Sequence, residues 1–561
     1  MKKFIAIAAI GCAAVMALAA CGGGNKRTGS SLEELQNKYG YQWTDPSKPI
    51  LNETGAKELS FNIYSSKNAS AKDYNDMDIM QTLFETTNVF VNWENVSETI
   101  YGEQKTLKLG KHNGIDAIYH AGLSANEILT YGTKRSTLLP ISDYLEYMPN
   151  FSKILEARPD IKKQITNVDG KIYALPRVEE MGLLQNPNLL FINKAWTEAA
   201  VEDGVNLGGK TIEDGLELTS AQMEALLTYF KTHDMNKNGN ANDERPLTFA
   251  YNTWQGNQCD LYGMFGLNDN LDHRVIVDGK VTYTVLDDAF KTATQFLHNW
   301  VANGLIDQVS FEQSQDQFLA NGKGTGGDEK YGAFYWWESE TVVSDPTNYV
   351  VCKPLIGPDN KQTVSVSNNP EISTGEVIFF KGTPNVEVLL TYFDRYYSPE
   401  ISAQINYGPI GIAFNEEKDA NGKLVAKAPP AGKTTDEIRL ENAPMGLCYL
   451  STEAWANTVE MEPRAKLRLE RLEKYATPYY DHNKVKPVPN LQFTEAELNI
   501  LIRYQTTIDN YLRENILSWL RNGLTDSAWE THKTKAVGNS VGIGEVQKVY
   551  QAAYDRYVAQ N

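Results

Sequence analysis

Short apolar runs alternate with amphipathic segments through the first part of the chain. Residues 59–66 (LSFNIYSS), 115–122 (IDAIYHAG) and 189–196 (LLFINKAW) are typical of buried strands, because β-branched and aromatic residues cluster in short runs. Residues 75–96 (NDMDIMQTLFETTNVFVNWENV) begin with the apolar spacing of a helix and end as a strand. Strands and helices that alternate at this spacing predict an α/β fold with parallel strands.

The second half continues the pattern with longer helices. Asp278 and Gly279 predict the turn of a hairpin over residues 277–285 (VDGKVTYTV). Residues 288–306 have the spacing of an amphipathic helix, and residues 331–339 (YGAFYWWES) predict a strand that ends in aromatic residues. A lysine- and proline-rich stretch, residues 418–437, predicts a surface excursion, and the last ~75 residues predict a helical ending.

The first residues predict an export signal. Two lysines precede an apolar run that is too short to cross a membrane, and small residues follow it. The tetrad LAAC, which ends at Cys21, resembles the bacterial lipobox, so residues 1–20 are expected to be a lipoprotein signal peptide and Cys21 the lipidated first residue. The alternative is a secretory signal that is cleaved elsewhere. Residues 21–55 are expected to be a lipid-anchored flexible tether, which places the protein outside the cytoplasm at the cell membrane.

The composition limits which binding partners and which disulfides the chain can have. The chain carries 53 basic and 71 acidic side chains, a formal net charge of −18. This balance argues against nucleic acid as a partner. Beyond Cys21 the exported chain would keep Cys259, Cys352 and Cys448, which leaves open one disulfide or, the simpler reading, free buried thiols. The aromatic content, with 30 tyrosines and 10 tryptophans, favours a flat, neutral, polar ligand, although much of it is expected to pack in cores.

Several stretches in combination resemble the lipid-anchored solute-binding proteins of bacterial ABC importers for carbohydrates, of the family 1 type. These are DAIYHAG with LLPISDYLEYMPNF, DGKIYALP (residues 169–176), LLFINKAW, YYSPEISAQINYGPIGIAF (residues 396–414) and the helical ending. The resemblance runs from about residue 56 to residue 558. It implies a two-lobe periplasmic-binding-protein-like fold with a hinged cleft and a helical C-terminal region. Lobe 1 is expected over residues 56–172 plus about 340–440, and lobe 2 over residues 173–339 plus about 441–561.

The loop DMNKNGNANDERPL, residues 234–247, has the oxygen spacing of a calcium site. Counted from Asp234, Asn236, Asn238, Gly239 and Asn240 fit the first half of an EF-hand loop. The twelfth position is an arginine, so the closing ligand would have to be Asp243 or Glu244. The hypothesis is a structural calcium ion of modest affinity, remote from the ligand. The alternative is a solvated turn without an ion.

Ligand-binding residues are expected just beyond the C-terminal ends of strands, where a carbohydrate meets aromatic faces and polar groups. The candidates are Ser65, Ser66, Tyr119, His120, Arg177, Glu179, Trp254, Trp336, Trp337 and Glu338. One of the two adjacent tryptophans is expected to face the core, because neighbouring strand residues point in opposite directions. For His120, a surface or second-layer role competes with ligand contact. For Glu179, the alternative is a solvated pair with Glu180.

The resemblance implies a monomeric binding protein that captures an oligosaccharide and delivers it to the transmembrane subunits of an ABC permease. No catalytic residues or catalytic cofactor are expected, since the sequence contains no Gly-x-Ser-x-Gly elbow, HExxH motif or phosphate loop. The alternatives are a binding protein for a peptide or another non-sugar solute, and an extracellular glycosidase. A structural adhesin is the least favoured hypothesis.

Overall fold

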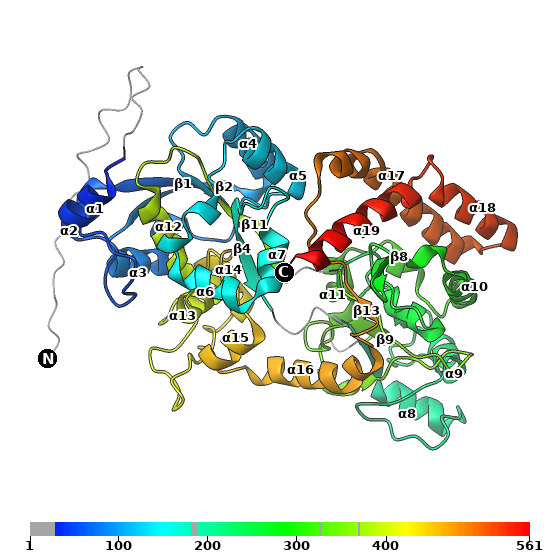
Figure 1. Ribbon diagram of the computed structural model, residues 1–561. Helices are drawn as coiled ribbons and strands as arrows, with labels where there is room; N and C mark the ends of the chain where they lie inside the picture. The colour runs from blue at the N-terminus through cyan, green and yellow to red at the C-terminus, as the bar shows by residue number, and fades with distance from the viewer. Residues whose placement is uncertain (1–28, 181–187, 325–327, 369–370, 561) are drawn as a thin grey trace, which may run out of the picture.

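The protein was analysed as a computed structural model, which describes residues 29–180, 188–324, 328–368 and 371–560. Figure 1 shows two lobes: blue, cyan and yellow segments form one, and green, orange and red segments form the other. We call them the larger-sheet lobe and the smaller-sheet lobe after their main sheets. Both are α/β, and the fold class predicted from the sequence is confirmed.

The larger-sheet lobe contains a six-stranded mixed sheet. Its strands, in spatial order, are β12 (Tyr449–Leu450), β4 (Ala174–Glu179), β11 (Ile372–Phe379), β3 (Ala117–Tyr119), β1 (Ser60–Lys67) and β2 (Phe90–Ser97). The β1 strand pairs parallel with β2 and β3, as the sequence pattern predicts, whereas β11 enters antiparallel between β3 and β4. The late strand β11 therefore joins two parts of the chain that the local pattern does not connect.

Eleven helices surround this sheet in the described part of the lobe. They are α1 (Leu32–Tyr39), α2 (Glu53–Glu58), α3 (Asp78–Thr87), α4 (Glu98–Gly110), α5 (Ala125–Ile128), α6 (Pro149–Ala157), α7 (Pro159–Ile165), α12 (Val386–Asp394), α13 (Pro399–Tyr407), α14 (Thr435–Asn442) and α15 (Thr452–Thr458). The predicted tether is wrong from Leu32 onward, because Leu35, Tyr39 and Ile50 are buried in the core of this lobe. Apolar side chains in that stretch are stabilised by burial, so the stretch folds.

The described residues of the smaller-sheet lobe form two sheets. One has the order β10 (Tyr349–Cys352), β5 (Leu189–Asn193), β9 (Tyr331–Trp336) and β6 (Arg245–Thr248), and the other has the order β13 (Val485–Lys486), β7 (Arg274–Val277) and β8 (Lys280–Tyr283). The β7–β8 hairpin is the one predicted at Asp278 and Gly279. Adjacent helices are α8 (Lys194–Glu202), α9 (Ser220–Thr232), α10 (Asp288–Ala302), α11 (Gln315–Lys323) and α16 (Pro463–Tyr475).

The C-terminal helices complete the core of this lobe. They are α17 (Glu495–Asn522), α18 (Asp526–Val537) and α19 (Ile543–Ala559). Thr494 and Glu497 form a capping box that starts α17, with the Glu497 carboxylate 2.8 Å from the Thr494 amide. Trp519 and Trp529 pack with Trp300 of α10 in one hydrophobic cluster. The predicted helical ending is therefore part of the lobe rather than an appendage.

Strand pairing differs from the predicted lobe boundaries at three strands. The β4 and β12 strands, expected in lobe 2, pair in the larger sheet, and β10, expected in lobe 1, pairs with β5 in the smaller-sheet lobe. The chain thus changes lobe between β4 and β5, between β10 and β11, and between α15 and α16. These partners lie far apart in sequence, and local periodicity carries no information on such pairing.

Two further expectations concern thiols and the membrane. Cys259, Cys352 and Cys448 are buried free thiols, and no disulfide joins them within the described residues. Across the part of the chain that the structure describes, no helix combines the length and the apolar character that a membrane span needs. Cys21 and the predicted signal peptide lie outside the described residues.

Candidate functional site

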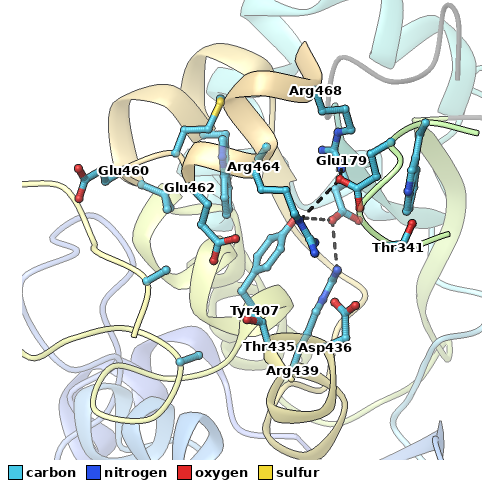
Figure 2. Close-up of a pocket in the computed structure, with 18 of the residues that line it drawn as sticks. Glu179, Thr341, Tyr407, Thr435, Asp436, Arg439, Glu460, Glu462, Arg464 and Arg468 are labelled. Atoms are coloured by element: carbon cyan, nitrogen blue, oxygen red, sulfur yellow. Dashed lines mark hydrogen bonds and ion pairs between the residues drawn. The ribbon is translucent and has the colours of Figure 1, made fainter. Parts of the chain in front are cut away.

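A cavity of about 470 Å³ lies between the two lobes (Figure 2), within the range typical of small-molecule sites. Side chains from both lobes line it. Those used below are Arg177, Glu179, Tyr407, Arg439 and Trp455 of the larger-sheet lobe, and Trp254, Trp337, Glu338, Arg464 and Arg468 of the smaller-sheet lobe. Five of the ten ligand-binding candidates from the sequence therefore meet at one cavity: Arg177, Glu179, Trp254, Trp337 and Glu338.

Glu179 is the centre of a paired polar cluster on the larger-sheet lobe. It sits at the end of β4, forms an ion pair with Arg177, and accepts hydrogen bonds from Tyr407 Oη at 3.1 Å and Arg439 Nη2 at 3.3 Å. The Arg439 guanidinium lies over the Tyr407 ring, 4.3 Å from its centroid, and Trp455 packs against the same ring with a centroid distance of 4.6 Å. Figure 2 shows how Glu179, Tyr407 and Arg439 converge.

The charge state of Glu179 follows from these neighbours. Burial alone would raise the pKa of its carboxyl, but the positive charges of Arg177 and Arg439 outweigh burial and hold that pKa below its ordinary value. Glu179 is thus a carboxylate with most of its acceptor capacity already used. The sequence left open whether it was a solvated pair with Glu180, and the structure separates the two, since Glu180 pairs with Arg158 instead.

The smaller-sheet lobe contributes the indoles of Trp254 and Trp337 and the carboxylate of Glu338. Trp337 and Glu338 follow directly after β9, and Trp254 follows β6. The rings of Trp254 and Trp337 meet edge to face with a centroid distance of 5.5 Å. Arg468 of α16 lies over the Trp337 ring at 5.4 Å. Aromatic rings beside charged groups are suited to a ligand with apolar C–H faces and hydroxyl edges.

Glu338 differs from Glu179 in how it is paired. Its side chain is 2% exposed, and its nearest cations are Arg464 Nε at 3.6 Å and Arg468 Nη1 at 4.0 Å. Burial raises the pKa of the Glu338 carboxyl, and the two arginines offset only part of that effect. Of these two lining carboxylates, Glu179 is therefore satisfied by its neighbours and Glu338 is only loosely paired.

The remaining candidates lie elsewhere. Trp336 is 1% exposed and packs with Phe318 and Phe334, so it is the member of the tryptophan pair that faces the core. Ser65 and Tyr119 are fully buried. Ser66 and His120 line a separate cavity of about 120 Å³. These five residues are not brought to the interlobe cavity.

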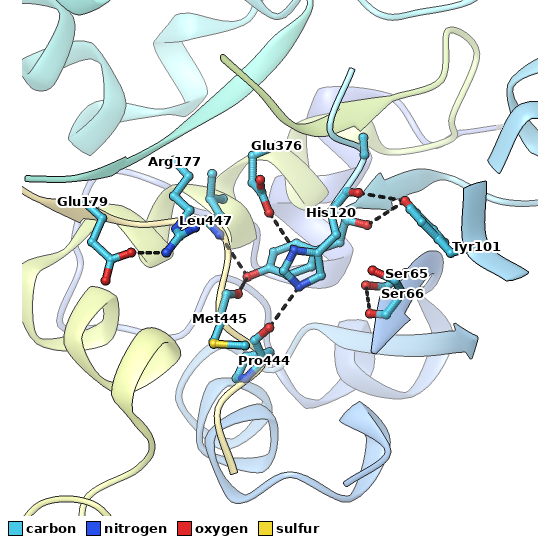
Figure 3. A network of polar contacts seen from close by, with 12 residues as sticks. Ser65, Ser66, Tyr101, His120, Arg177, Glu179, Glu376, Pro444, Met445 and Leu447 are labelled. Atoms are coloured by element: carbon cyan, nitrogen blue, oxygen red, sulfur yellow. Dashed lines mark hydrogen bonds and ion pairs between the residues drawn. The ribbon is translucent and has the colours of Figure 1, made fainter. Parts of the chain in front are cut away.

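Four of them instead support the loop of residues 443–448, which connects α14 to β12 (Figure 3). His120 Nε2 lies 2.9 Å from the carbonyl oxygen of Pro444, and Nδ1 lies 2.7 Å from Glu376 Oε1. Tyr119 Oη donates to the Met445 carbonyl and accepts from the Leu447 amide at 3.0 Å. Ser65 donates to the Ser66 carbonyl, and Ser66 in turn accepts from Tyr74, whose hydroxyl also reaches Pro444.

The sequence reading missed Tyr407, Arg439, Trp455, Arg464 and Arg468. Tyr407 lies in the stretch of residues 396–414 that carries the resemblance, and that was a usable signal. The other four lie on helices after residue 434, where nothing in the local pattern separates a cavity-facing side from a solvated one. Their placement depends on α14, α15 and α16 closing over the ends of distant strands.

The predicted calcium loop is held by hydrogen bonds to its own backbone. Asp234 accepts from the amides of Asn238 at 3.1 Å and Gly239 at 2.8 Å, and Asn236 and Asn238 accept from amides two residues further on. The loop connects α9 to β6. The cavity lining, as far as the described residues define it, contains none of its side chains.

Asp243 and Glu244, at the end of the loop, have only some of the features of cation ligands. Asp243 pairs with Lys330 at 3.2 Å, and Glu244 Oε1 accepts from the Met235 amide at 2.7 Å. Asp243 Oδ1 and Glu244 Oε2 are buried and have no hydrogen-bond partner within the described chain. Among the described residues, however, no group of three or more His, Cys, Asp or Glu side chains converges as metal ligands would. An ion here would need the asparagine oxygens, including Asn240, and a shift of the two acids.

Two α/β lobes with a ligand-sized cavity between them define a periplasmic-binding-protein-like fold, here with C-terminal helices added. No protein-family model matches the chain. The chain is 28% identical over 570 residues to the fructooligosaccharide ABC transporter substrate-binding protein FusA of Streptococcus pneumoniae serotype 4. The aligned region covers 100% of this chain and 99% of the relative.

Solved structures agree with this likeness. FusA of S. pneumoniae in complex with kestose superimposes with a TM-score of 0.76 at 26% identity, over 90% of this chain and 100% of that chain. A FusA EF-hand mutant in complex with fructo-nystose gives a TM-score of 0.76 at 25% identity over the same shares. A human-milk-oligosaccharide-binding solute-binding protein from Bifidobacterium longum infantis has a TM-score of 0.74 at 20% identity over 91% of this chain and 99% of that chain, which supports the fold alone.

Proposed function

We propose that the chain is the substrate-binding protein of an ABC importer and captures an oligosaccharide in the interlobe cavity. The observation that carries the proposal is the likeness to FusA over the whole chain, including both lobes and the C-terminal helices. FusA is named for fructooligosaccharides and was solved with kestose, so short fructooligosaccharides are the first ligands to test.

The chemistry of the cavity supports this ligand class. Trp254, Trp337 and Trp455 supply aromatic surface for the C–H faces of sugar rings, and Glu179 and Glu338 with their arginines supply partners for hydroxyl groups. We assign ligand contact to Arg177, Glu179, Trp254, Trp337 and Glu338 from the predicted set, and add Tyr407, Arg439 and Trp455.

The mechanism involves no bond chemistry. A ligand that contacts both lobes favours the closed state, because only that state makes both sets of contacts. The closed protein then docks on the permease, which releases the ligand for uptake. A lipid on Cys21 would keep the protein near the permease on the outer side of the membrane. The net charge of −18 argues against nucleic acid as a partner.

We also propose that the loop from Asp234 to Glu244 binds calcium as a structural staple. The FusA EF-hand mutant indicates that this relative has such a loop. In this chain the support is the pair of buried, unpartnered oxygens on Asp243 and Glu244, counted within the described residues. Two neutral asparagine ligands predict modest affinity, suited to the calcium concentration outside cells.

Calorimetric titration of the chain from Gly22 onward with kestose, nystose, maltotriose and xylotriose tests the function. Each sugar is recovered afterwards and examined by chromatography. We expect at least one sugar to bind and to be recovered intact. Cleavage of the sugar would indicate a glycosidase, and absence of binding to all four would favour a peptide or another non-sugar solute.

A further inference from the structure

The Glu338 carboxylate lines the cavity and, among the described residues, is buried without hydrogen bonds. Its side chain is 2% exposed, and within the described chain neither of its oxygens has a hydrogen-bond partner. An ionised carboxylate in this position loses its hydration and regains little from its neighbours, which is costly. Such a group indicates that a partner from outside the chain completes the site.

The neighbouring cations stand too far away to bond directly. Arg464 Nε and Arg468 Nη1 lie 3.6 Å and 4.0 Å from Glu338 Oε2, beyond the 2.7–3.2 Å of an N–H···O hydrogen bond. A hydroxyl group that contacts both the carboxylate and a guanidinium from the side can donate to the first and accept from the second. Neither a carbonyl nor an ammonium group can do both.

Two further polar atoms are unsatisfied at the same place. Trp337 Nε1 and Arg468 Nε are buried and have no hydrogen-bond partner among the residues described. The unsatisfied acceptors of Glu338 and the unsatisfied donors of Trp337 and Arg468 thus belong to residues that line the same cavity. A group of neighbouring hydroxyls, each both donor and acceptor, matches this arrangement. A carboxylated sugar would place a negative charge against Glu338.

We infer that Glu338, Arg464 and Arg468 form a hydroxyl clamp, which holds neighbouring hydroxyls of a neutral sugar ring packed against Trp254 and Trp337. The inference rests on the proposed oligosaccharide-binding function and names the residues that determine specificity within it. All three clamp residues belong to the smaller-sheet lobe, where α16 is fixed by Leu472 and Tyr475 in the core and by the ion pair of Arg471 with Asp214 at 3.0 Å.

This location has a consequence for binding. The clamp does not need lobe closure to form, because β9 and α16 belong to the same lobe. The smaller-sheet lobe therefore engages the sugar in the open protein. The satisfied Glu179 cluster and the Tyr407 and Trp455 rings of the other lobe then close on the exposed side of the sugar.

The test compares Glu338→Gln with Glu329→Gln. Glu329 is a half-buried glutamate just before β9; its Oε2 accepts hydrogen bonds from Asn193 and Asn348, and it does not line the cavity as the described residues define it. A second pair is Arg468→Met with Lys466→Met, both on α16; the Lys466 side chain is 67% exposed and does not line the cavity as the described residues define it. Each variant is first checked for unfolding temperature and then titrated with kestose, nystose, maltotriose and xylotriose.

For every sugar that the unmodified protein binds, we expect Glu338→Gln and Arg468→Met to weaken binding at least tenfold, since charge-assisted hydrogen bonds are lost. The two controls should stay within about twofold of the unmodified protein. Monodeoxy derivatives of a bound sugar give an independent readout. Removal of a clamped hydroxyl should weaken binding to the unmodified protein but not further weaken binding to Glu338→Gln.

Affinities of Glu338→Gln and Arg468→Met equal to those of their controls would overturn the clamp while leaving the proposed function intact. Additive losses between Glu338→Gln and every monodeoxy sugar would also overturn it. Failure of the unmodified protein to bind any of the four sugars would overturn the proposed function, and the clamp with it. If Glu338→Gln fails to fold, the clamp is tested by the affinities of Arg468→Met and its control and by the binding of the monodeoxy sugars to the unmodified protein.

Discussion

Gly446 is the most sensitive position in the loop of residues 443–448. Its φ is +91°, in the left-handed region, and a Cβ built there would lie 2.6 Å from His120 Cε1, 2.7 Å from Glu376 Oε1 and 2.9 Å from Tyr119 Oη. These atoms belong to buried or half-buried side chains whose hydrogen bonds fix them. We predict that Gly446→Ala strongly destabilises the larger-sheet lobe.

The expected loss of unfolding free energy in Gly446→Ala has two parts. The left-handed backbone conformation costs an alanine about 1–2 kcal/mol, and overpacking of a filled site costs about 1–3 kcal/mol. The sum is about 2–5 kcal/mol, a large part of the stability of a domain. Gly170 isolates the first part, because its φ is +79° and no described atom lies within 4 Å of its Cβ position. We expect Gly170→Ala to cost only about 1–2 kcal/mol.

Urea unfolding of the three proteins, followed by tryptophan fluorescence and by circular dichroism, measures both costs in the same lobe. A midpoint for Gly446→Ala well below that of Gly170→Ala supports the packing described for Tyr119, His120 and Glu376. Equal midpoints would refute it. A displaced loop would also shift α14, so Gly446→Ala should weaken sugar binding through Arg439.

Three further predictions follow from single contacts. Trp336→Ala should lower the unfolding free energy by about 3–5 kcal/mol because this ring is buried in the core, whereas the neighbouring Trp337→Ala should mainly weaken sugar binding in calorimetry; the reverse outcome would contradict the assignment. The pKa of Glu179 is lowered in the folded protein, so its stabilising contribution is present above the unfolded value of 4.5 and is lost as the pH falls through the folded value. The difference in unfolding free energy between the unmodified protein and Glu179→Gln should therefore shrink as the pH is lowered from about 6 to about 3, and a constant difference would contradict the charge pairing. Calcium should raise the unfolding temperature of the EDTA-treated protein but not that of Asp234→Ala. Asp419→Ala, which removes an aspartate from another turn, should still respond to calcium. An unchanged unfolding temperature of the unmodified protein would contradict calcium binding and show that the loop is a solvated turn.

Much of the fold was predictable from the sequence because its first strands and helices have strong local patterns. Residues 59–66, 115–122 and 189–196 all contain strands, and the Asp278–Gly279 turn is present. The assignment of β4, β10 and β12 to lobes was not predictable. Each pairs with a strand far away in sequence, and apolar periodicity does not specify which strand that is.

The candidate site was also predictable from the sequence only in part. Trp337 and Glu338 follow a strand directly, and the rule that ligands bind beyond strand ends placed them at the cavity. The same rule selected Tyr119 and His120, but the loop of residues 443–448 covers that strand end and uses their hydrogen bonds. Arg464 and Arg468 stand on α16, more than 120 positions after Glu338, so only the tertiary structure brings them together.

A crystal structure of the protein with the most tightly bound of the four sugars tests the central claim most directly. The account predicts the sugar in the interlobe cavity, with a ring against Trp254 or Trp337 and hydroxyls within hydrogen-bond distance of Glu338 and Arg468. A sugar bound on an outer face of either lobe, with the Glu338 carboxylate still without a hydrogen-bond partner, would contradict it.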